Sequence, residues 1–129
     1  METSRIAAKS FKELLVWQKA HQLVLAVYRL TDAFPKHELF ALTSQVRRAA
    51  VSVPANIAEG FRKRGPKDKV RIFNIAEGSL EEVHYYLILA QDLAYGETAG
   101  LTEQANEVGR LLEAYCSAIR TSIKKETRG

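Results

Sequence analysis

The sequence is poor in the residues that build disulfides, metal clusters and irregular loops. Its 129 residues include one cysteine, three prolines and one tryptophan. A single cysteine excludes an intrachain disulfide, and Cys116 lies at helical spacing among apolar residues, so we expect a small buried thiol. No apolar run approaches the roughly 20 residues that a membrane-spanning helix requires, and Met1–Lys12 lacks the pattern of a secretory signal. We therefore expect a cytoplasmic protein without a membrane partner.

The motifs of common enzymes and metal centres are also missing. The sequence has no glycine-rich phosphate loop, no cysteine pair at metal-binding spacing and no nucleophile elbow. Glu81 and His84 form a Glu-x-x-His pair, which is half of the di-metal arrangement found in four-helix bundles, but the second pair does not occur. We expect no metal, no cofactor and no enzymatic activity. A metal-dependent enzyme at these two residues is an alternative hypothesis.

Apolar residues recur at spacings of three and four along nearly the whole chain, and strand-like alternation is not sustained anywhere. This periodicity is typical of amphipathic helices. Breakers near Pro35, at Gly65-Pro66 and from Gly96 to Gly100 divide the pattern into four segments. Because short connections make successive helices antiparallel, the sequence predicts an all-α, up-down-up-down four-helix bundle formed by one domain, residues 1–129. The expected helices are residues 10–32, 36–63, 66–95 and 101–124.

Pro54 lies inside the second expected helix. Proline in a helix interior removes a backbone hydrogen bond and costs roughly 3 kcal/mol, so the surrounding packing must compensate. The apolar stripe also shifts its phase across Pro54, from Val53 to Ile57 and Phe61. The sequence therefore predicts a kink near Pro54 that absorbs this shift.

Positive charge gathers in one short segment. Residues 61–71 carry six cations against Asp68 alone, whereas the whole chain has a net charge of only +4. In an up-down-up-down bundle this turn lies at the same end as both termini, so 13 of the 19 Lys and Arg residues are expected there. A basic end of this kind is the electrostatic footprint of a protein that contacts phosphate. The candidate nucleic-acid-binding residues are Arg62, Lys63, Arg64, Lys67, Lys69 and Arg71, and the cations expected from the termini are Arg5, Lys9, Lys12, Arg120, Lys124, Lys125 and Arg128.

Two interpretations of this basic end are open from the sequence. Lys and Arg also favour helix C-termini and solvated turns, and such positions need no ligand. Phe61 is the one aromatic residue within the segment, so platforms on which single-stranded bases could stack are not evident there.

Six polar residues fall on or near the apolar faces of the second and third expected helices. An unpaired charge there would be costly, so we expect these side chains to pair with one another in a network that fixes the helix register around Pro54. Arginine equally suits a contact with a neighbouring subunit or a phosphate, because its planar fork makes paired hydrogen bonds. The residues assigned to a structural network or a subunit interface are Arg47, Arg48, Asn56, Glu59, Asn74 and Glu77.

Several short sequence motifs together resemble one known family. They are LVWQKA at 15–20, Phe34-Pro35 with Glu38, FALTSQ at 40–45, RRAAVSVPANIAEG at 47–60 and FNIAEGSL at 73–80. In this order, over about Phe11 to Leu112, they resemble the four-helix bundle family of the 23S ribosomal RNA intervening-sequence protein. Ala41 departs from the pattern, since glycine is expected before the leucine, but alanine favours a helix.

The resemblance implies a bacterial protein without established enzymatic activity, of a kind encoded within inserts of large-subunit ribosomal RNA genes in some bacteria. The family is also similar to the accessory variability protein of diversity-generating retroelements, a pentameric, positively charged barrel that works with a reverse transcriptase and nucleic acid. By this resemblance we expect a ring-shaped homopentamer whose basic ends combine into a strong field that attracts RNA. The alternative is a protein-interaction or scaffold module without nucleic-acid binding, whose kinked helix forms the oligomer surface.

Overall fold

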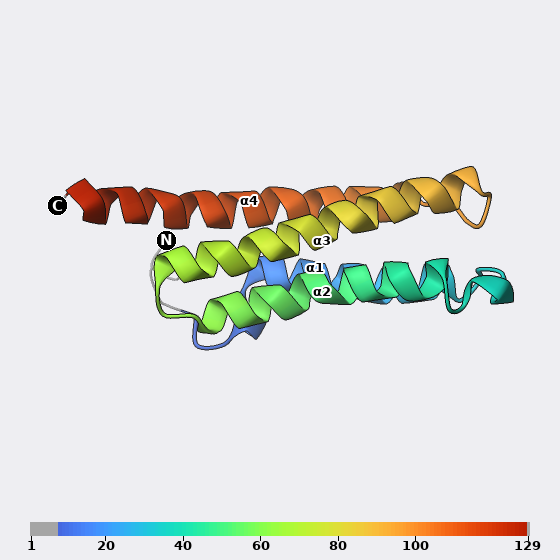
Figure 1. Ribbon diagram of the computed structural model, residues 1–129, viewed down its shortest axis with the longest axis horizontal. Helices are drawn as coiled ribbons and strands as arrows, with labels where there is room; N and C mark the ends of the chain where they lie inside the picture. The colour runs from blue at the N-terminus through green and yellow to red at the C-terminus, as the bar shows by residue number, and fades with distance from the viewer. Residues whose placement is uncertain (1–7, 129) are drawn as a thin grey trace.

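The computed structural model describes the backbone of residues 8–128 and the side chains of residues 8–125. Within this range, four long helices and two short 3-10 turns make up the regular structure (Figure 1). Residues 8–128 contain no strand, so the all-α fold class predicted from the sequence is confirmed. In chain order the elements are η2 (Phe11–Glu13), α1 (Leu15–Thr31), η3 (Lys36–Glu38), α2 (Leu42–Arg62), α3 (Pro66–Asp92) and α4 (Ala99–Arg128).

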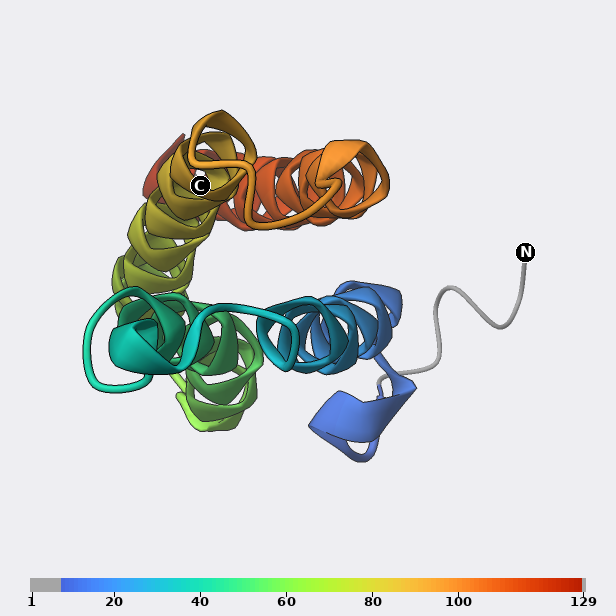
Figure 2. The same cartoon turned by 90° about the vertical axis from the view of Figure 1, so that its right-hand side faces the viewer.

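The four long helices pack as a bundle. α1 contacts α2, α2 contacts α3, α3 contacts α4 and α4 contacts α1, whereas the two diagonal pairs make no close backbone contact within the described range. The view along the bundle shows the helices arranged around a common centre (Figure 2). The α2–α3 connection, η2 and the end of α4 lie toward one end of the molecule, and η3 and the α3–α4 connection lie at the other (Figure 1).

One continuous core fills the bundle. The side chains of Leu23, Ile57, Phe73 and Cys116 are each less than 2% exposed, and each comes from a different helix. This is the result that apolar spacings of three and four produce when every helix turns one stripe inward. Cys116 is therefore the buried thiol that its spacing predicted, and burial raises its pKa to about 11. Pro54 is also buried within α2, so the packing that a helical proline needs is present.

α2 begins at Leu42 rather than at residue 36, because Pro35 starts only the 3-10 turn η3. The Glu38 carboxylate then accepts a hydrogen bond from the backbone N–H of Leu42 (3.2 Å), which satisfies one unpaired donor of the first helical turn. Its other oxygen accepts a hydrogen bond from the hydroxyl of Tyr95 (2.8 Å), which joins this helix start to the α3–α4 connection. The Tyr95 bond, followed by the Leu42 bond, lowers the pKa of Glu38.

α3 ends at Asp92, although the sequence predicted a helix to residue 95. The N–H of Ala94 donates to the carbonyl of Gln91 (3.0 Å) and the N–H of Tyr95 donates to the carbonyl of Ala90 (2.9 Å), which closes the helix in a Schellman motif. Ala94 has a φ of 61°, a left-handed conformation that glycine usually takes. Because Ala94 and not glycine takes this conformation, the sequence has no glycine that would mark the end of α3.

α1 starts at Leu15 rather than at residue 10, because residues 11–13 form the separate turn η2 and Leu14 is extended. The Ser10 hydroxyl accepts a hydrogen bond from the N–H of Lys12 (3.2 Å) and so begins this turn. α4 runs Ala99–Arg128, which is longer at both ends than the expected 101–124. η2 contacts α2, and this contact builds part of the site described below.

Gly60 lets α2 approach α3 closely, and the Gly60→Ala variant should lose about 1–2 kcal/mol of its free energy of unfolding. A Cβ atom at position 60 would lie 2.6 Å from Cε1 of Phe73. Because Phe73 is 1% exposed, its ring cannot move aside without disturbing the core. Overpacking costs about 1–3 kcal/mol, against a gain of at most about 1 kcal/mol in helix propensity. Urea unfolding followed by circular dichroism measures the difference.

The matched control is Gly78→Ala on α3. A Cβ atom at position 78 meets nothing within 4 Å, so this variant should gain about 0.5–1 kcal/mol from helix propensity alone. If Gly60→Ala and Gly78→Ala were stabilised equally, the close approach at Phe73 would not restrict position 60.

Candidate nucleic-acid interface

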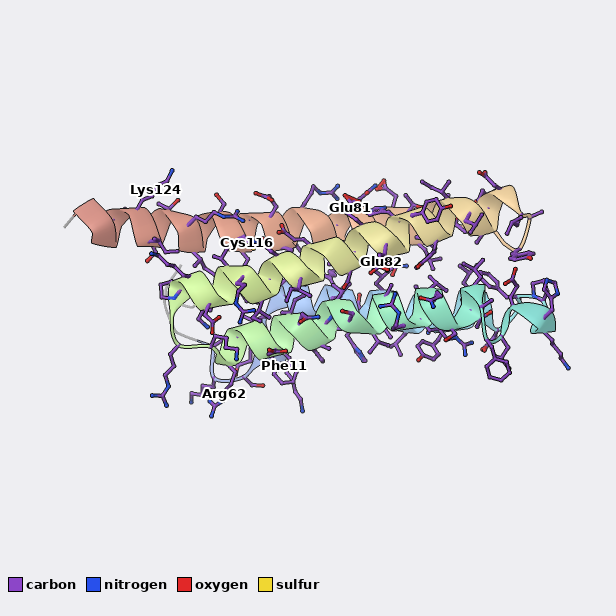
Figure 3. The ribbon with its side chains drawn as sticks, viewed as in Figure 1. Phe11, Arg62, Glu81, Glu82, Cys116 and Lys124 are labelled. Carbon is purple, nitrogen blue, oxygen red and sulfur yellow. The ribbon has the colours of Figure 1, made fainter. Side chains whose placement is uncertain are left out.

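The basic segment lies at one end of the bundle. Residues 63–65 connect α2 to α3, and η2 and the last turns of α4 lie toward the same end (Figure 1). Arg62 of α2 and Lys124 of α4 both lie toward this end in Figure 3. Lys9 and Lys12 lie in or next to η2, and Lys125 lies near the end of α4. The side chains of all three are exposed. The fold therefore brings cations from three separate parts of the sequence to one end of the molecule.

Three of the six candidate residues are exposed and unpaired. Arg62, Arg64 and Lys67 are exposed, and none of their side chains makes a hydrogen bond or ion pair with another described residue. Their charged groups are therefore available to a polyanion in solution. Arg5 and the side chain of Arg128, which the sequence also assigned to this end, lie outside the described residues.

Lys69 has a structural partner. Its ammonium donates hydrogen bonds to the carbonyls of Phe61 (2.7 Å) and Gly60 (3.3 Å) in the last turn of α2, where the Gly60 carbonyl also accepts a hydrogen bond from the backbone N–H of Lys63 (3.1 Å). The same ammonium lies 5.4 Å from the centre of the Phe61 ring, within the range of a cation–π contact. Partial burial lowers the pKa of Lys69. Lys69 therefore caps α2 and is less available to phosphate than the sequence suggested.

Lys63 and Arg71 are paired with neighbouring carboxylates. The Lys63 ammonium lies 4.0 Å from the Glu59 carboxylate, and Arg71 makes a 2.8 Å ion pair with Asp68. Both are pairs within one helix surface, and such pairs contribute little to stability. A phosphate could therefore compete for Lys63 and Arg71, but only against an existing partner.

A groove of about 550 Å³ opens beside the basic segment. Phe11 of η2 lines one side, and Ala58 and Phe61 of α2 line the other, together with Arg62. Phe11 was not among the residues selected from the sequence, because only the packing of η2 against α2 brings it to this place. The basic segment itself contains one aromatic residue, Phe61, and the packing of η2 places a second one, Phe11, beside it.

The six polar residues of the expected network do not pair with one another, so that prediction was wrong. Arg47 donates to the Thr31 hydroxyl (2.8 Å) and to the Asp32 carboxylate (3.0 Å). Its guanidinium also lies 4.6 Å from the ring centre of Tyr28. Tyr28 and Thr31 lie in the last turn of α1 and Asp32 follows it directly, so Arg47 joins α2 to the end of α1 rather than to α3.

Arg48 joins α2 to α3. Its guanidinium donates to Gln45 on its own helix (3.2 Å) and to the Glu82 carboxylate (3.0 Å) on α3. Glu82 lies on the part of α3 that faces α2 in Figure 3. The side chains of Arg48 and Glu82 are 55% and 44% exposed, so this pair forms at the surface and not beneath Pro54.

The remaining members of the expected network also find other partners. Asn56 donates to the carbonyl (2.8 Å) and hydroxyl (2.9 Å) of Ser52, and the Ser52 hydroxyl lies 2.8 Å from that of Ser79 on α3. Asn74 accepts a hydrogen bond from Arg120 of α4 (3.2 Å). The expectation of one network failed because these side chains diverge around their helices toward three different neighbours.

The pKa of Glu77, a residue of α3, is influenced by charged side chains of α4. Partial burial raises its pKa, the nearby Glu113 carboxylate raises it further, and the Arg120 guanidinium opposes the rise. Glu113 and Arg120 form an ion pair at 3.9 Å on α4. The pKa of Glu77 therefore depends first on its burial and then on charged groups of α4, and not on Arg47 or Arg48.

The described residues offer neither a metal cluster nor a membrane span. Glu81 is exposed on α3 (Figure 3) and His84 is half-buried. Within residues 8–125, no group of three or more His, Cys, Asp or Glu side chains is arranged to hold a metal ion. No helix of the described part of the chain combines the length and apolar character needed to cross a bilayer.

The packing of α1 to α4 and the exposed cations at one end define the class of the molecule, an all-α four-helix bundle protein with a basic end. Residues 12–114 match the family described as 23S rRNA-intervening sequence protein. The chain belongs to this family, which confirms the resemblance seen in its sequence motifs.

A solved structure has the same fold. It is the crystal structure of a protein with unknown function from the S23 ribosomal protein family of Bacteroides thetaiotaomicron VPI-5482. It superposes with a TM-score of 0.74 at 21% sequence identity, over 80% of this chain and 96% of that chain. At this identity the similarity establishes the fold alone. No curated protein matches the sequence.

Proposed function

We propose that this protein is a non-enzymatic, ring-forming four-helix bundle protein that binds RNA through its basic end. The observation that carries the proposal is the exposure of Arg62, Arg64 and Lys67 without a partner among the described residues. Cations presented in this way displace condensed counterions when they contact phosphate, and this attraction does not depend on base sequence. The link between the family and ribosomal RNA genes makes RNA the first polyanion to test.

The proposal includes an architecture and an assembly. The chain path is antiparallel, up-down-up-down, which is supported by connections that lie at alternate ends of the bundle (Figure 1). α2 is kinked near Pro54, since a proline inside a helix cannot donate the backbone hydrogen bond at its position. The assembly is a homopentamer in the bacterial cytoplasm, as the similarity to the accessory variability protein suggests. Five basic ends around one axis would multiply the field of a single chain.

Titration of the protein with a structured RNA across salt concentrations tests the proposal. In a filter-binding or mobility-shift assay, we expect the logarithm of the affinity to fall linearly with the logarithm of the salt concentration. The slope should be about −0.7 to −0.9 for each phosphate contacted. Absence of affinity at low salt would contradict the proposal.

A second candidate function is a protein-interaction or scaffold module, and an apolar surface formed by α2 and the residues just before it favours it. Phe40 is 92% exposed, Leu39 is 48% exposed and Val51 is 42% exposed, and all three line a groove of about 570 Å³ together with Arg47 and Arg48. Exposed apolar patches of this kind mark interaction surfaces. If this candidate is right, Phe40→Glu lowers the assembly mass measured by light scattering, and the wild-type protein shows no affinity for RNA.

A further inference from the structure

The groove beside the basic segment combines apolar rings with cations. Phe11 and Phe61 line it from two different elements, and Lys9, Arg62 and Lys63 line it as well. Figure 3 shows Phe11 and Arg62 near each other at this end of the bundle. Among the described residues, Glu59 is the one acidic residue that lines the groove, and its carboxylate is already paired with Lys63. Three cations against one paired carboxylate leave the groove electropositive.

Both aromatic rings are held in place from outside the groove. The Phe11 ring meets the Trp17 ring edge-on at a centroid distance of 5.0 Å, and Trp17 in turn stacks on His21 at 5.2 Å. Phe61 is held by Lys69, whose ammonium binds the Phe61 carbonyl and lies 5.4 Å from its ring centre. Both phenylalanines are nevertheless partly exposed. Rings fixed in this way offer a contact surface without further loss of side-chain freedom on binding.

We propose that this groove binds one unpaired nucleotide of an RNA strand, with its base against Phe11 and Phe61 and its flanking phosphates on Lys9, Arg62 and Lys63. The inference deepens the proposed RNA binding and depends on it. A volume of about 550 Å³ lies within the range of small-molecule sites. Stacking on aromatic rings requires a base whose faces are exposed, which a base inside a duplex does not offer. A second copy of the chain is a poorer occupant, because it would bring the same cations together.

Two phenylalanine variants and two RNAs test the proposal. The probes are a single-stranded uridine oligomer of about 12 nucleotides and a duplex of equal length, whose two strands carry about twice as many phosphates but offer no exposed base face. Phe61→Leu and Phe11→Leu keep an apolar side chain but remove the ring. Each should bind the single strand about 5- to 100-fold more weakly and the duplex within about twofold of the wild type. Phe61→Tyr restores the ring and should restore the affinity, and Phe40→Leu, at the other end, should change neither.

Trp17 provides a readout at the site itself. It is the only tryptophan in the chain and its ring contacts Phe11, so the uridine oligomer should quench its fluorescence in the wild type. In Phe61→Leu the quenching should need an RNA concentration about 5- to 100-fold higher, as the loss of affinity requires. Circular dichroism of each variant confirms that the bundle has folded.

The possible outcomes separate the two proposals. If the wild type binds RNA but the leucine variants bind both probes equally well, the groove is not the site, and the basic end alone accounts for the binding. If the wild type binds neither probe at low salt, both proposals fail. An equal loss of single-strand and duplex affinity in the leucine variants would also overturn the groove proposal. The same holds if the leucine changes lower the assembly mass and leave RNA affinity unchanged, because a second copy would then occupy the groove.

Discussion

The Phe73→Ala variant should lose about 3–5 kcal/mol of its free energy of unfolding. Phe73 is 1% exposed, and its ring meets that of Tyr115 on α4 at 5.3 Å. On its other side the ring lies against Gly60 of α2. Truncation therefore removes apolar contacts to two neighbouring helices and leaves a cavity in a core that cannot collapse to fill it. Urea unfolding at a fixed protein concentration measures the loss, since assembly would otherwise shift the midpoint.

Ile75→Ala is the matched control for this variant. Ile75 lies on the same helix but is 46% exposed, so its truncation should change the free energy of unfolding by less than about 1 kcal/mol. A loss below about 1 kcal/mol for Phe73→Ala would mean that the three helices do not pack around this ring as described.

Reversing the three unpaired cations should abolish most of the RNA affinity. In the variant Arg62→Glu, Arg64→Glu, Lys67→Glu, each lost phosphate contact becomes a repulsion. We expect affinity at low salt to fall by about two orders of magnitude or more, and the salt slope to fall by about 2 to 3. These side chains are exposed and make no described contact, so the fold should be unaffected. Mobility-shift titration of the variant and the wild type across salt gives both quantities.

A second triple variant controls for net charge. Arg29, Lys36 and Arg110 are also exposed and lie away from the basic end, and their side chains make no hydrogen bond or ion pair with another described residue. Their reversal to Glu changes the net charge by the same amount. We expect it to weaken RNA binding far less than reversal at the basic end does. Equal losses in the two variants would show that overall charge, and not the basic end, attracts RNA.

The helices could be predicted from the sequence, but several of their ends could not. Apolar spacing alone selects the face of each helix that contains Leu23, Ile57 or Phe73. The start of α2, in contrast, depends on the Glu38 carboxylate, which accepts a hydrogen bond from Tyr95 of the α3–α4 connection. No local pattern contains that contact.

The candidate site shows the same division between local and distant information. The charge of residues 61–71 is evident in the sequence, and the exposure of Arg62, Arg64 and Lys67 agrees with it. The hydrogen bond of Lys69, in contrast, depends on the position of the last carbonyls of α2. The contacts of Arg47 depend on the position of the end of α1. The position of Phe11 likewise depends on η2, which is a separate turn before α1 and packs against α2. Spacing within one helix cannot reveal such partners, because they are brought close by the packing of different elements.

The burial of the only thiol has a kinetic consequence. Cys116 is 0% exposed on the inner side of α4, and its pKa of about 11 leaves only about one molecule in ten thousand as thiolate at neutral pH. A water-soluble alkylating reagent can reach the sulfur only when α4 separates locally from the bundle. The rate of alkylation therefore depends on that separation, and it reports the fraction of molecules in which this helix is open.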